Sequence, residues 1–258
     1  MVLAAQKRKS ETTRRAVRRP TLRYEKNCWA EGFRLIAGVD EVGRGSLFGP
    51  VVAGAVILDP ERPIRGLQDS KQLDAASREI LSQRIHERAL AVSVAAVDSG
   101  RIDFINIYQA SRLAMRDAIN SLQPNPDYVL IDALRIDVDL PQLPIIGGDA
   151  RSRSIAAASI VAKVERDRWM KIWDQVYPAY RLASNKGYSA PEHLAALAAH
   201  GPTPLHRLSF EPVARATRFA AGFPDGQLSL FDDLPAGGER TRENQLAAEA
   251  VAGMGARG

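Results

Sequence analysis

Two apolar runs near the start of the chain most constrain its fold. Residues 35–42 (LIAGVDEV) and 51–58 (VVAGAVIL) are short, rich in Val, Ile and Ala, and separated by the glycine-containing loop GRGSLFGP. Apolar runs of this length, bounded by turn residues, are typical of buried strands. The two runs therefore predict a pair of strands joined as a hairpin, with ordered structure beginning near Leu35.

Strands and helices alternate after this hairpin. We expect a helix over 74–88 with Asp74 as its N-cap, a strand over 91–97, a helix over 103–122, strands at 128–132 and near 143–146, and a long helix over about 152–173. Three early strands followed by this alternation indicate an α/β domain with a mixed sheet.

Composition divides the chain into four parts. Residues 1–22 are basic and poor in apolar side chains, which predicts a disordered arm that could add phosphate affinity. The α/β domain is expected over 23–177, and a small subdomain of helices and Pro/Gly-rich loops over 178–221, which ends near Phe219. Residues 222–258 are rich in Gly, Pro, Asp and Glu and predict a flexible tail.

The totals restrict the class of protein. Lys and Arg number 35 against 30 Asp and Glu, a modest excess that favours anionic partners such as nucleic acid. No apolar run approaches the roughly 20 residues of a membrane-spanning helix, and the N-terminus lacks the apolar core of a secretory signal. The single cysteine, Cys28, excludes an internal disulfide. A monomeric cytoplasmic protein is expected.

Acidic side chains end two of the predicted strands. Asp40 and Glu41 close the first apolar run, and Asp132 closes YVLID. Strand ends of α/β sheets converge on one place, and clustered carboxylates need a cation between them. Their oxygens suit Mg²⁺ or Mn²⁺, although each acid taken singly also fits a cap or turn. Because neighbours on a strand point to opposite faces, we expect the strand to break or twist at Glu41, which Gly43 permits.

The string AGVDEVGRGSLFGPVVAGAVI resembles the signature of the ribonuclease HII family. The resemblance continues in order through LQDSKQL (67–73), LID (130–132), GDARSRSIAAASIVAKVERD (148–167), KGYSAPEH (186–193) and GPTPLHRLSF (201–210). It implies a ribonuclease H-like mixed β-sheet flanked by helices, with a small C-terminal helical subdomain. It also implies a metal-dependent endonuclease that hydrolyses the RNA strand of RNA–DNA hybrids. Such an enzyme nicks on the 5′ side of single ribonucleotides in duplex DNA, leaving a 5′-phosphate and a 3′-hydroxyl, during replication and repair.

The resemblance implies four catalytic acids that hold two Mn²⁺ or Mg²⁺ ions. Asp40, Glu41 and Asp132 match three of these acids. The residues alone leave three candidates for the fourth: Asp137, Asp149 and Asp167. The family places this acid just before the SIAAASI helix, which selects Asp149.

The resemblance also implies contacts to substrate. The backbone of the GRG string and a tyrosine contact the ribonucleotide in the family, and further residues contact phosphates. The matching positions are Gly43, Arg44, Gly45 and Tyr188 for the ribonucleotide, and Ser70, Lys71 and Lys186 for phosphates. His193 and His206 are interpreted as structural. The chain departs from the family's usual pattern at Ser46, where Pro is frequent, at Ala133, where Gly is common, and at Gly147, where Lys often stands.

The tail contains one apolar string, QLSLF, at residues 227–231. It resembles the motif by which bacterial proteins bind the sliding clamp, and its anchors are Gln227, Leu228, Leu230 and Phe231. The alternative is that the segment folds back onto its own domain. Two other functions stay open at this point: a DNA-only nuclease of the same superfamily, and a non-catalytic nucleic-acid-binding accessory of the clamp.

Overall fold

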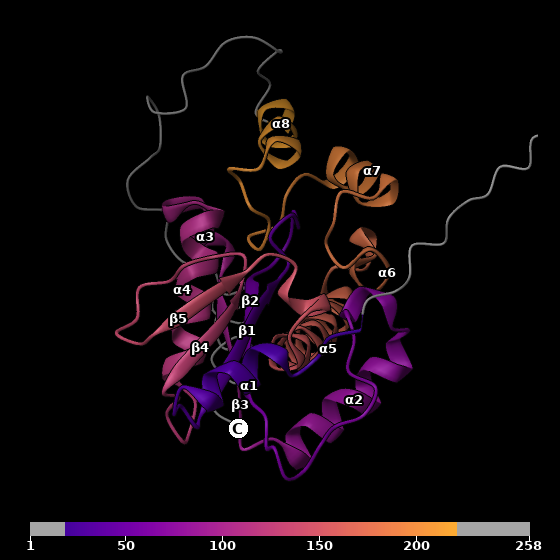
Figure 1. The fold of residues 1–258 in the computed structure, drawn as a ribbon. Coiled ribbons are helices and arrows are strands. Elements are labelled where there is room, and N and C mark those ends of the chain that lie inside the picture. The colour runs from indigo at the N-terminus through magenta and orange to yellow at the C-terminus, as the bar shows by residue number, and fades with distance from the viewer. Residues whose placement is uncertain (1–18, 221–258) are drawn as a thin grey trace, which may run out of the picture. The chain divides into compact units, whose positions relative to one another are not determined.

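The structure is a computed structural model, and it describes residues 19–220 (Figure 1). The strands are β1 (Ile36–Val42), β2 (Val51–Ile57), β3 (Ala91–Val97), β4 (Tyr128–Asp132) and β5 (Gln142–Ile145). The helices are α1 (Arg23–Ala30), α2 (Ala75–Arg88), α3 (Ser99–Ile105), α4 (Ile107–Asn120), α5 (Arg153–Val176), α6 (Leu182–Asn185), α7 (Pro191–His200) and α8 (Glu211–Ala220). The 3₁₀ turns are η1 (Ser70–Gln72), η2 (Gly148–Ala150) and η3 (Pro178–Tyr180). None of the helices in this part of the chain is both long and apolar enough to cross a membrane.

The sheet of the described residues has five strands in the order β3-β2-β1-β4-β5. β1 runs parallel to β4, with Val39 opposite Ile131, and β4 runs parallel to β5, with Asp132 opposite Ile145. The loop between β1 and β2 is too short for a parallel crossover, so these two strands are antiparallel. The mixed sheet that the sequence predicts is therefore confirmed.

The elements group into two compact units built from interleaved segments. The first comprises residues 19–40, 53–94 and 115–164, and the second comprises 41–52, 95–114 and 165–220.

Close contact between α5 and the sheet organises the first unit. A Cβ at Gly38 of β1 would lie 2.0 Å from the carbonyl carbon of Ser154, and one at Gly54 of β2 would lie 2.5 Å from the carbonyl oxygen of Ala158. Glycines at these positions let the helix backbone approach the strands. The adjoining core brings α2 against the same elements through Val56, Ile64, Leu67, Leu81, Ile85, Ala157, Ile160 and Val161.

Helix α1 anchors the beginning of α5. The buried Glu25 accepts hydrogen bonds from the Ser152 hydroxyl at 2.7 Å and from the Ser154 amide at 2.9 Å. A carboxylate at this helix N-terminus satisfies backbone donors that have no partner within the helix. The expectation that order begins near Leu35 is wrong, because α1 begins at Arg23 and is held by this long-range contact.

The single helix expected over 103–122 is also wrong. Two helices, α3 and α4, meet at Asn106, whose φ of 67° ends the first. The Asn106 side chain then accepts a hydrogen bond from the Gln109 amide at 3.1 Å and caps the second. Asparagine tolerates this left-handed conformation better than most residues.

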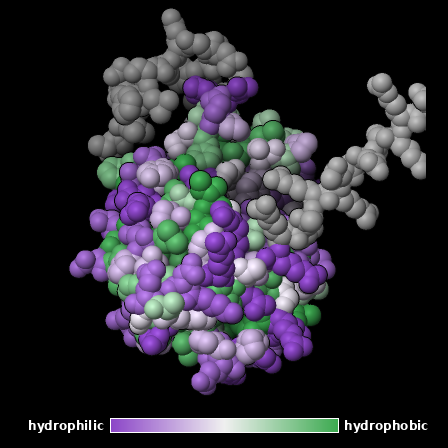
Figure 2. All heavy atoms as spheres, viewed as in Figure 1, coloured by the Kyte–Doolittle hydropathy of each residue, from purple (hydrophilic) through white to green (hydrophobic). Residues whose placement is uncertain are grey.

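The other predicted elements agree closely with the structure. The strands at 91–97 and 128–132, the cap at Asp74 and the long helix α5 are confirmed. Predictions for the basic arm up to residue 18 and for the string at 227–231 lie outside the described residues. On the face drawn in Figure 2, hydrophilic and apolar side chains are intermingled.

Candidate active site

Three acids of the first unit lie at or beside the ends of its parallel strands. Asp40 is 6% exposed and Asp149 is 7% exposed, which is unusual for carboxylates. Asp40 and Asp132 directly follow the paired residues Val39 and Ile131, so the β1–β4 register places these two acids side by side. The sequence therefore delivers adjacent carboxylates to one edge of the sheet, as predicted.

A backbone hydrogen bond connects Asp132 to the turn that carries Asp149. The Gly148 amide donates to Asp132 Oδ1 at 2.7 Å, and Gly148 is the residue before Asp149. The η2 turn thus holds Asp149 close to Asp132. The rival candidate Asp137 is exposed, and Asp167 lies well along α5, whereas Asp149 lies in the η2 turn just before that helix.

Lys71 supplies a cation beside these acids. Its Nζ lies 3.6 Å from Asp149 Oδ2, and its side chain is 82% exposed. Partial loss of hydration lowers the pKa of Lys71, but four surrounding carboxylates outweigh this and raise it: Asp149, Asp69, Asp40 and Asp132. The ammonium therefore sits in the combined negative field of the acids.

The pKa of Asp149 is raised, first by burial and then by repulsion from Asp69, with Lys71 opposing and Asp132 adding to the shift. A buried carboxylate beside other acids favours protonation unless a cation is close. The ionised form of Asp149 is therefore destabilised by its surroundings. A bound cation, in addition to the exposed Lys71, would stabilise it.

The carboxylate oxygens of these acids suit a hard cation, although the side chains do not converge on a single point. Within residues 19–220, no three His, Cys, Asp or Glu side chains converge tightly enough to hold a metal ion as they stand. Asp40, Asp132 and Asp149 all offer carboxylate oxygen, which Mg²⁺ and Mn²⁺ prefer. A bound ion would have to draw these side chains together against their repulsion.

Ser70, a predicted phosphate contact, is buried in η1. Its hydroxyl lies 3.0 Å from the Ser159 hydroxyl of α5. Next to it, the Lys71 amide donates to Asp69 Oδ1 at 2.9 Å, so the turn fixes the backbone from which the Lys71 side chain extends. Ser70 thus joins η1 to α5, while Lys71 faces solvent.

The second unit contains Glu41, the remaining predicted acid, and the glycine loop that follows it. β1 continues through Glu41 to Val42, so the strand does not break at Glu41, and the chain turns at Gly43 with φ +91°. Arg44 Nη1 lies 3.3 Å from Glu41 Oε1 and pairs with it. A Cβ at Gly43 would lie 2.3 Å from Arg166 Nε, so glycine is required here for space as well as conformation.

Arg166 joins the two strings that the sequence assigns to ribonucleotide recognition. Its guanidinium is fully buried and donates to the Ser46 hydroxyl at 2.7 Å, to the Phe48 carbonyl at 3.2 Å and to the Lys186 carbonyl at 2.9 Å. Burial lowers its pKa. Ser46, where the family often has Pro, therefore provides a hydroxyl that this arginine uses.

Arg207 is a second fully buried guanidinium in this unit. It donates to the Gly49 carbonyl at 2.9 Å and to the Arg44 carbonyl at 2.8 Å. Burial first, and repulsion from Arg166 second, lower its pKa to about 9. Sequence reasoning missed both arginines; the charged residues inside the strings KVERD and HRLSF were the available signal.

Tyr188 presents its ring at the surface. The side chain is 38% exposed, and the Arg166 guanidinium carbon lies 5.6 Å from the ring centroid. Lys186 Nζ donates to the Ala183 carbonyl, so this predicted phosphate contact bonds within its own loop. A Cβ at Gly45 would meet only Tyr188, at 4.0 Å, which places the glycine loop beside the tyrosine.

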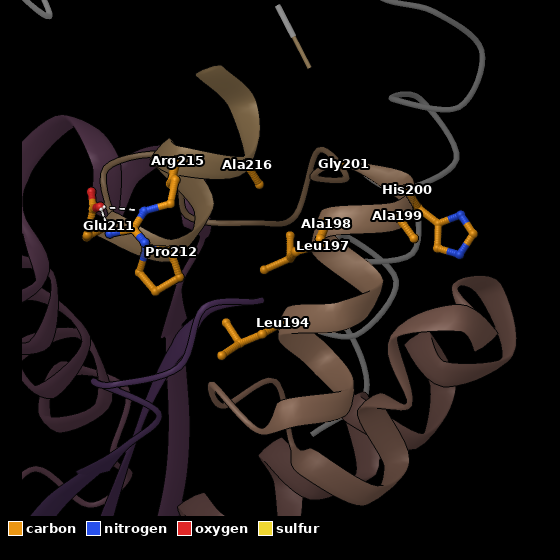
Figure 3. Close-up of a pocket in the computed structure, with 10 residues that line it drawn as sticks. All are labelled: Leu194, Leu197, Ala198, Ala199, His200, Gly201, Glu211, Pro212, Arg215 and Ala216. Atoms are coloured by element: carbon orange, nitrogen blue, oxygen red, sulfur yellow. Dashed lines mark hydrogen bonds and ion pairs between the residues drawn. The ribbon is translucent and has the colours of Figure 1, made fainter. Parts of the chain in front are cut away.

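A cavity of about 920 Å³ lies between α7 and α8, apart from these groups (Figure 3). Leu194 and Leu197 point across it towards Pro212, and the Glu211–Arg215 ion pair, at 2.9 Å, lies at one end. Its acid is already paired and its walls are largely apolar. Beside this pair, His200 is the remaining ionisable side chain among the described residues that line the cavity.

Comparison with known proteins identifies relatives of most of the described region. A family model described as Ribonuclease HII matches residues 37–213. Ribonuclease HII of Solibacter usitatus is 61% identical over 208 residues, which cover 81% of this chain and 91% of that protein. Ribonuclease HII of Enterococcus faecalis is 53% identical over 190 residues, which cover 74% of each chain.

Solved structures show the same fold. Ribonuclease H2 from Pyrococcus horikoshii is 27% identical, has a TM-score of 0.64, and matches over 72% of this chain and 99% of that one. A complex of PCNA with ribonuclease HII from Archaeoglobus fulgidus has a TM-score of 0.60 over 70% of this chain and 96% of that one. Its identity is 24%, so this second likeness concerns the fold alone.

Proposed function

This chain belongs to the ribonuclease HII family, and from that premise we propose that it nicks duplex DNA at embedded ribonucleotides and also cleaves the RNA strand of RNA–DNA hybrids. It is an endoribonuclease of the ribonuclease H type. The proposed cut lies on the 5′ side of the ribonucleotide and leaves a 5′-phosphate and a 3′-hydroxyl. The observation that carries the proposal is the acid group Asp40, Asp132 and Asp149, of which Asp40 and Asp149 are buried, gathered at the strand ends beside Lys71.

We propose that these three acids, with Glu41 directly after Asp40 in the chain, hold two divalent ions, Mg²⁺ or Mn²⁺. Such ions, when bound, activate water and stabilise the leaving oxygen. The protein's own part is to keep the carboxylates in place: the Gly148 amide orients Asp132, and the Ala150 amide donates to Asp149 Oδ1 at 2.9 Å. These hydrogen bonds leave the other oxygen of each carboxylate to face a cation.

Recognition of the ribose is assigned to the glycine loop and to Tyr188. Gly43 and Gly45 carry no side chain, so backbone groups of the loop can approach a 2′-hydroxyl, the group that distinguishes RNA from DNA. The exposed ring of Tyr188 can stack on the neighbouring sugar. Lys71, with its exposed ammonium, is the better placed of the two predicted lysines for a phosphate contact, since Lys186 bonds within its loop.

The decisive experiment uses a DNA duplex that contains one ribonucleotide, incubated with Mg²⁺ or Mn²⁺. We expect metal-dependent nicking on the 5′ side of the ribonucleotide, with no cleavage of an all-DNA duplex. Asp132→Asn should abolish it because one ligand oxygen and one negative charge are lost. Asp137→Asn, a change at an exposed acid nearby in the sequence, is the matched control and should keep the parent rate.

Either of two results would contradict the proposal. Equal cleavage of the all-DNA duplex would identify a DNA nuclease of the same fold. Binding of the substrate without turnover, whatever the metal, would identify a nucleic-acid-binding accessory.

We further propose a cytoplasmic role in removing ribonucleotides during replication and repair, with the string QLSLF at 227–231 as a sliding-clamp ligand. This rests on the sequence alone, because the string lies outside the described residues. Deleting residues 227–231 should abolish retention on immobilised clamp while leaving cleavage of short duplexes intact. Deleting residues 236–240 of the same tail is the control and should leave binding to the clamp unchanged. If the variant that lacks residues 227–231 still binds the immobilised clamp, the assignment is refuted.

A further inference from the structure

Two buried histidines meet next to the predicted sugar-contacting tyrosine. His193 of α7 and His206 are 0% and 1% exposed, and their Nε2 atoms lie 3.0 Å apart. Neither ring takes part in the chemistry proposed above. Two imidazoles in direct contact within a core need a specific arrangement of protons, because two charged rings would repel each other.

The surrounding backbone fixes that arrangement. The Thr203 amide donates to His206 Nδ1 at 2.9 Å, so this nitrogen carries no proton and the proton lies on Nε2. His206 Nε2 then donates to His193 Nε2, which leaves the remaining proton on His193 Nδ1. That nitrogen donates at 2.9 Å to the carbonyl oxygen of Tyr188. The chain of hydrogen bonds therefore has one direction and ends on the backbone of Tyr188.

The segment that ends at Tyr188 needs such support. Arg181, Lys186 and Gly187 all have positive φ, at 52°, 54° and 78°. Non-glycine residues in this conformation persist only where their surroundings determine them. Arg166 holds the carbonyl of Lys186 from one direction, and His193 holds the carbonyl of Tyr188 from the other.

We propose that the His193–His206 pair is a positioning device that sets the place of the Tyr188 ring, and through it the preference for a ribonucleotide. The proposal rests on the role assigned to Tyr188 in the proposed function. The two histidines act through the Tyr188 carbonyl and not by touching substrate.

Two substitutions of His193 separate positioning from simple packing. In His193→Asn the side-chain amide nitrogen can replace Nδ1 and keep the bond to Tyr188, whereas the acceptor for His206 is lost. In His193→Gln the amide can replace Nε2 and keep the acceptor for His206, whereas the donor to Tyr188 is lost. His200→Gln, at an exposed position of the same helix, is the control.

Cleavage of the duplex with a single ribonucleotide is measured for each variant with Tyr188 present and with Tyr188→Ala. With Tyr188 present, we expect kcat/KM to fall about tenfold in His193→Gln and to stay within about threefold of the parent in His193→Asn. In the Tyr188→Ala background, His193→Gln should cost less than about twofold, because residues that act as a unit are not additive. Hydrogen exchange over residues 183–190 should quicken in His193→Gln alone.

Three results would overturn the inference: equal losses in both His193 variants, an undiminished loss in the Tyr188→Ala background, or unchanged exchange over 183–190 in His193→Gln. Failure of the proposed function looks different, because the parent would then not cut this duplex or Tyr188→Ala would cut it as fast. In that case the exchange comparison between the two variants still decides whether His193 positions the segment.

Discussion

Replacing Gly38 by alanine tests whether close contact between β1 and α5 holds the catalytic acids together. The new Cβ would lie 2.0 Å from the Ser154 carbonyl carbon and 2.3 Å from the Ile155 amide nitrogen. Both neighbours are backbone atoms, which cannot rotate away as a side chain would. The helix must therefore move by roughly 1.5 Å to restore ordinary contact, and overpacking of this kind costs about 3 kcal/mol or more.

The assay is urea denaturation of the purified protein, read as the free energy of unfolding. We expect Gly38→Ala to lower it by about 3 kcal/mol with an unchanged m-value. Gly100→Ala is the control, because its Cβ would meet only Asp98 Oδ1 at 3.4 Å and the position lies in helix α3. That variant should be neutral or slightly more stable.

The same change should also weaken catalysis, since α5 begins directly after the η2 turn that carries Asp149. A displaced helix start moves this acid relative to Asp40. A loss smaller than about 1 kcal/mol in Gly38→Ala, with normal cleavage, would refute the claim that this contact is tight.

Three further outcomes are expected. Burial lowers the pKa of His206 to about 3, so its contribution to stability is complete above its ordinary pKa and is lost as the pH falls towards 3. Between pH 7.5 and pH 5 the parent should lose roughly 2 kcal/mol more than His206→Gln in urea denaturation, and equal losses would contradict this. Lys71→Gln removes an ammonium 3.6 Å from Asp149, so calorimetry should show Mn²⁺ binding about two- to fivefold tighter, and weaker binding would contradict the competition. Glu25→Gln loses a charged acceptor for Ser154 and should lower the free energy of unfolding by about 1.5–3 kcal/mol, whereas no change would show that α5 is anchored by other contacts.

The strands of this fold could be predicted because their apolar runs are continuous and end at turn residues. The helices were harder to predict where a single residue or a contact with a distant part of the chain determines their ends. Asn106 divides an otherwise helical pattern through a conformation that its neighbours do not reveal. Helix α1 is short, and its position depends on Glu25, whose side chain contacts residues far along the chain.

The acids of the site were predictable for a physical reason: carboxylates at the ends of buried strands have few structural uses. Arg166 and Arg207 were not, because arginine is almost always exposed and only the folded chain supplies the carbonyls that surround these two. The contact between His193 and His206 likewise depends on how α7 meets the segment after it, which no sequence pattern encodes.

The hydrogen bonds of the Glu25 carboxylate limit how far the chain can be truncated from its N-terminus. A chain trimmed to the first apolar run, at Leu35, would keep every strand, every predicted metal ligand and both recognition strings. It would nevertheless expose the first turn of α5 and remove the cover of Leu130 and Ile155, which pack with Cys28 of α1. The smallest stable fragment of this enzyme therefore begins upstream of its first strand, and shorter fragments should be recovered mainly as aggregates.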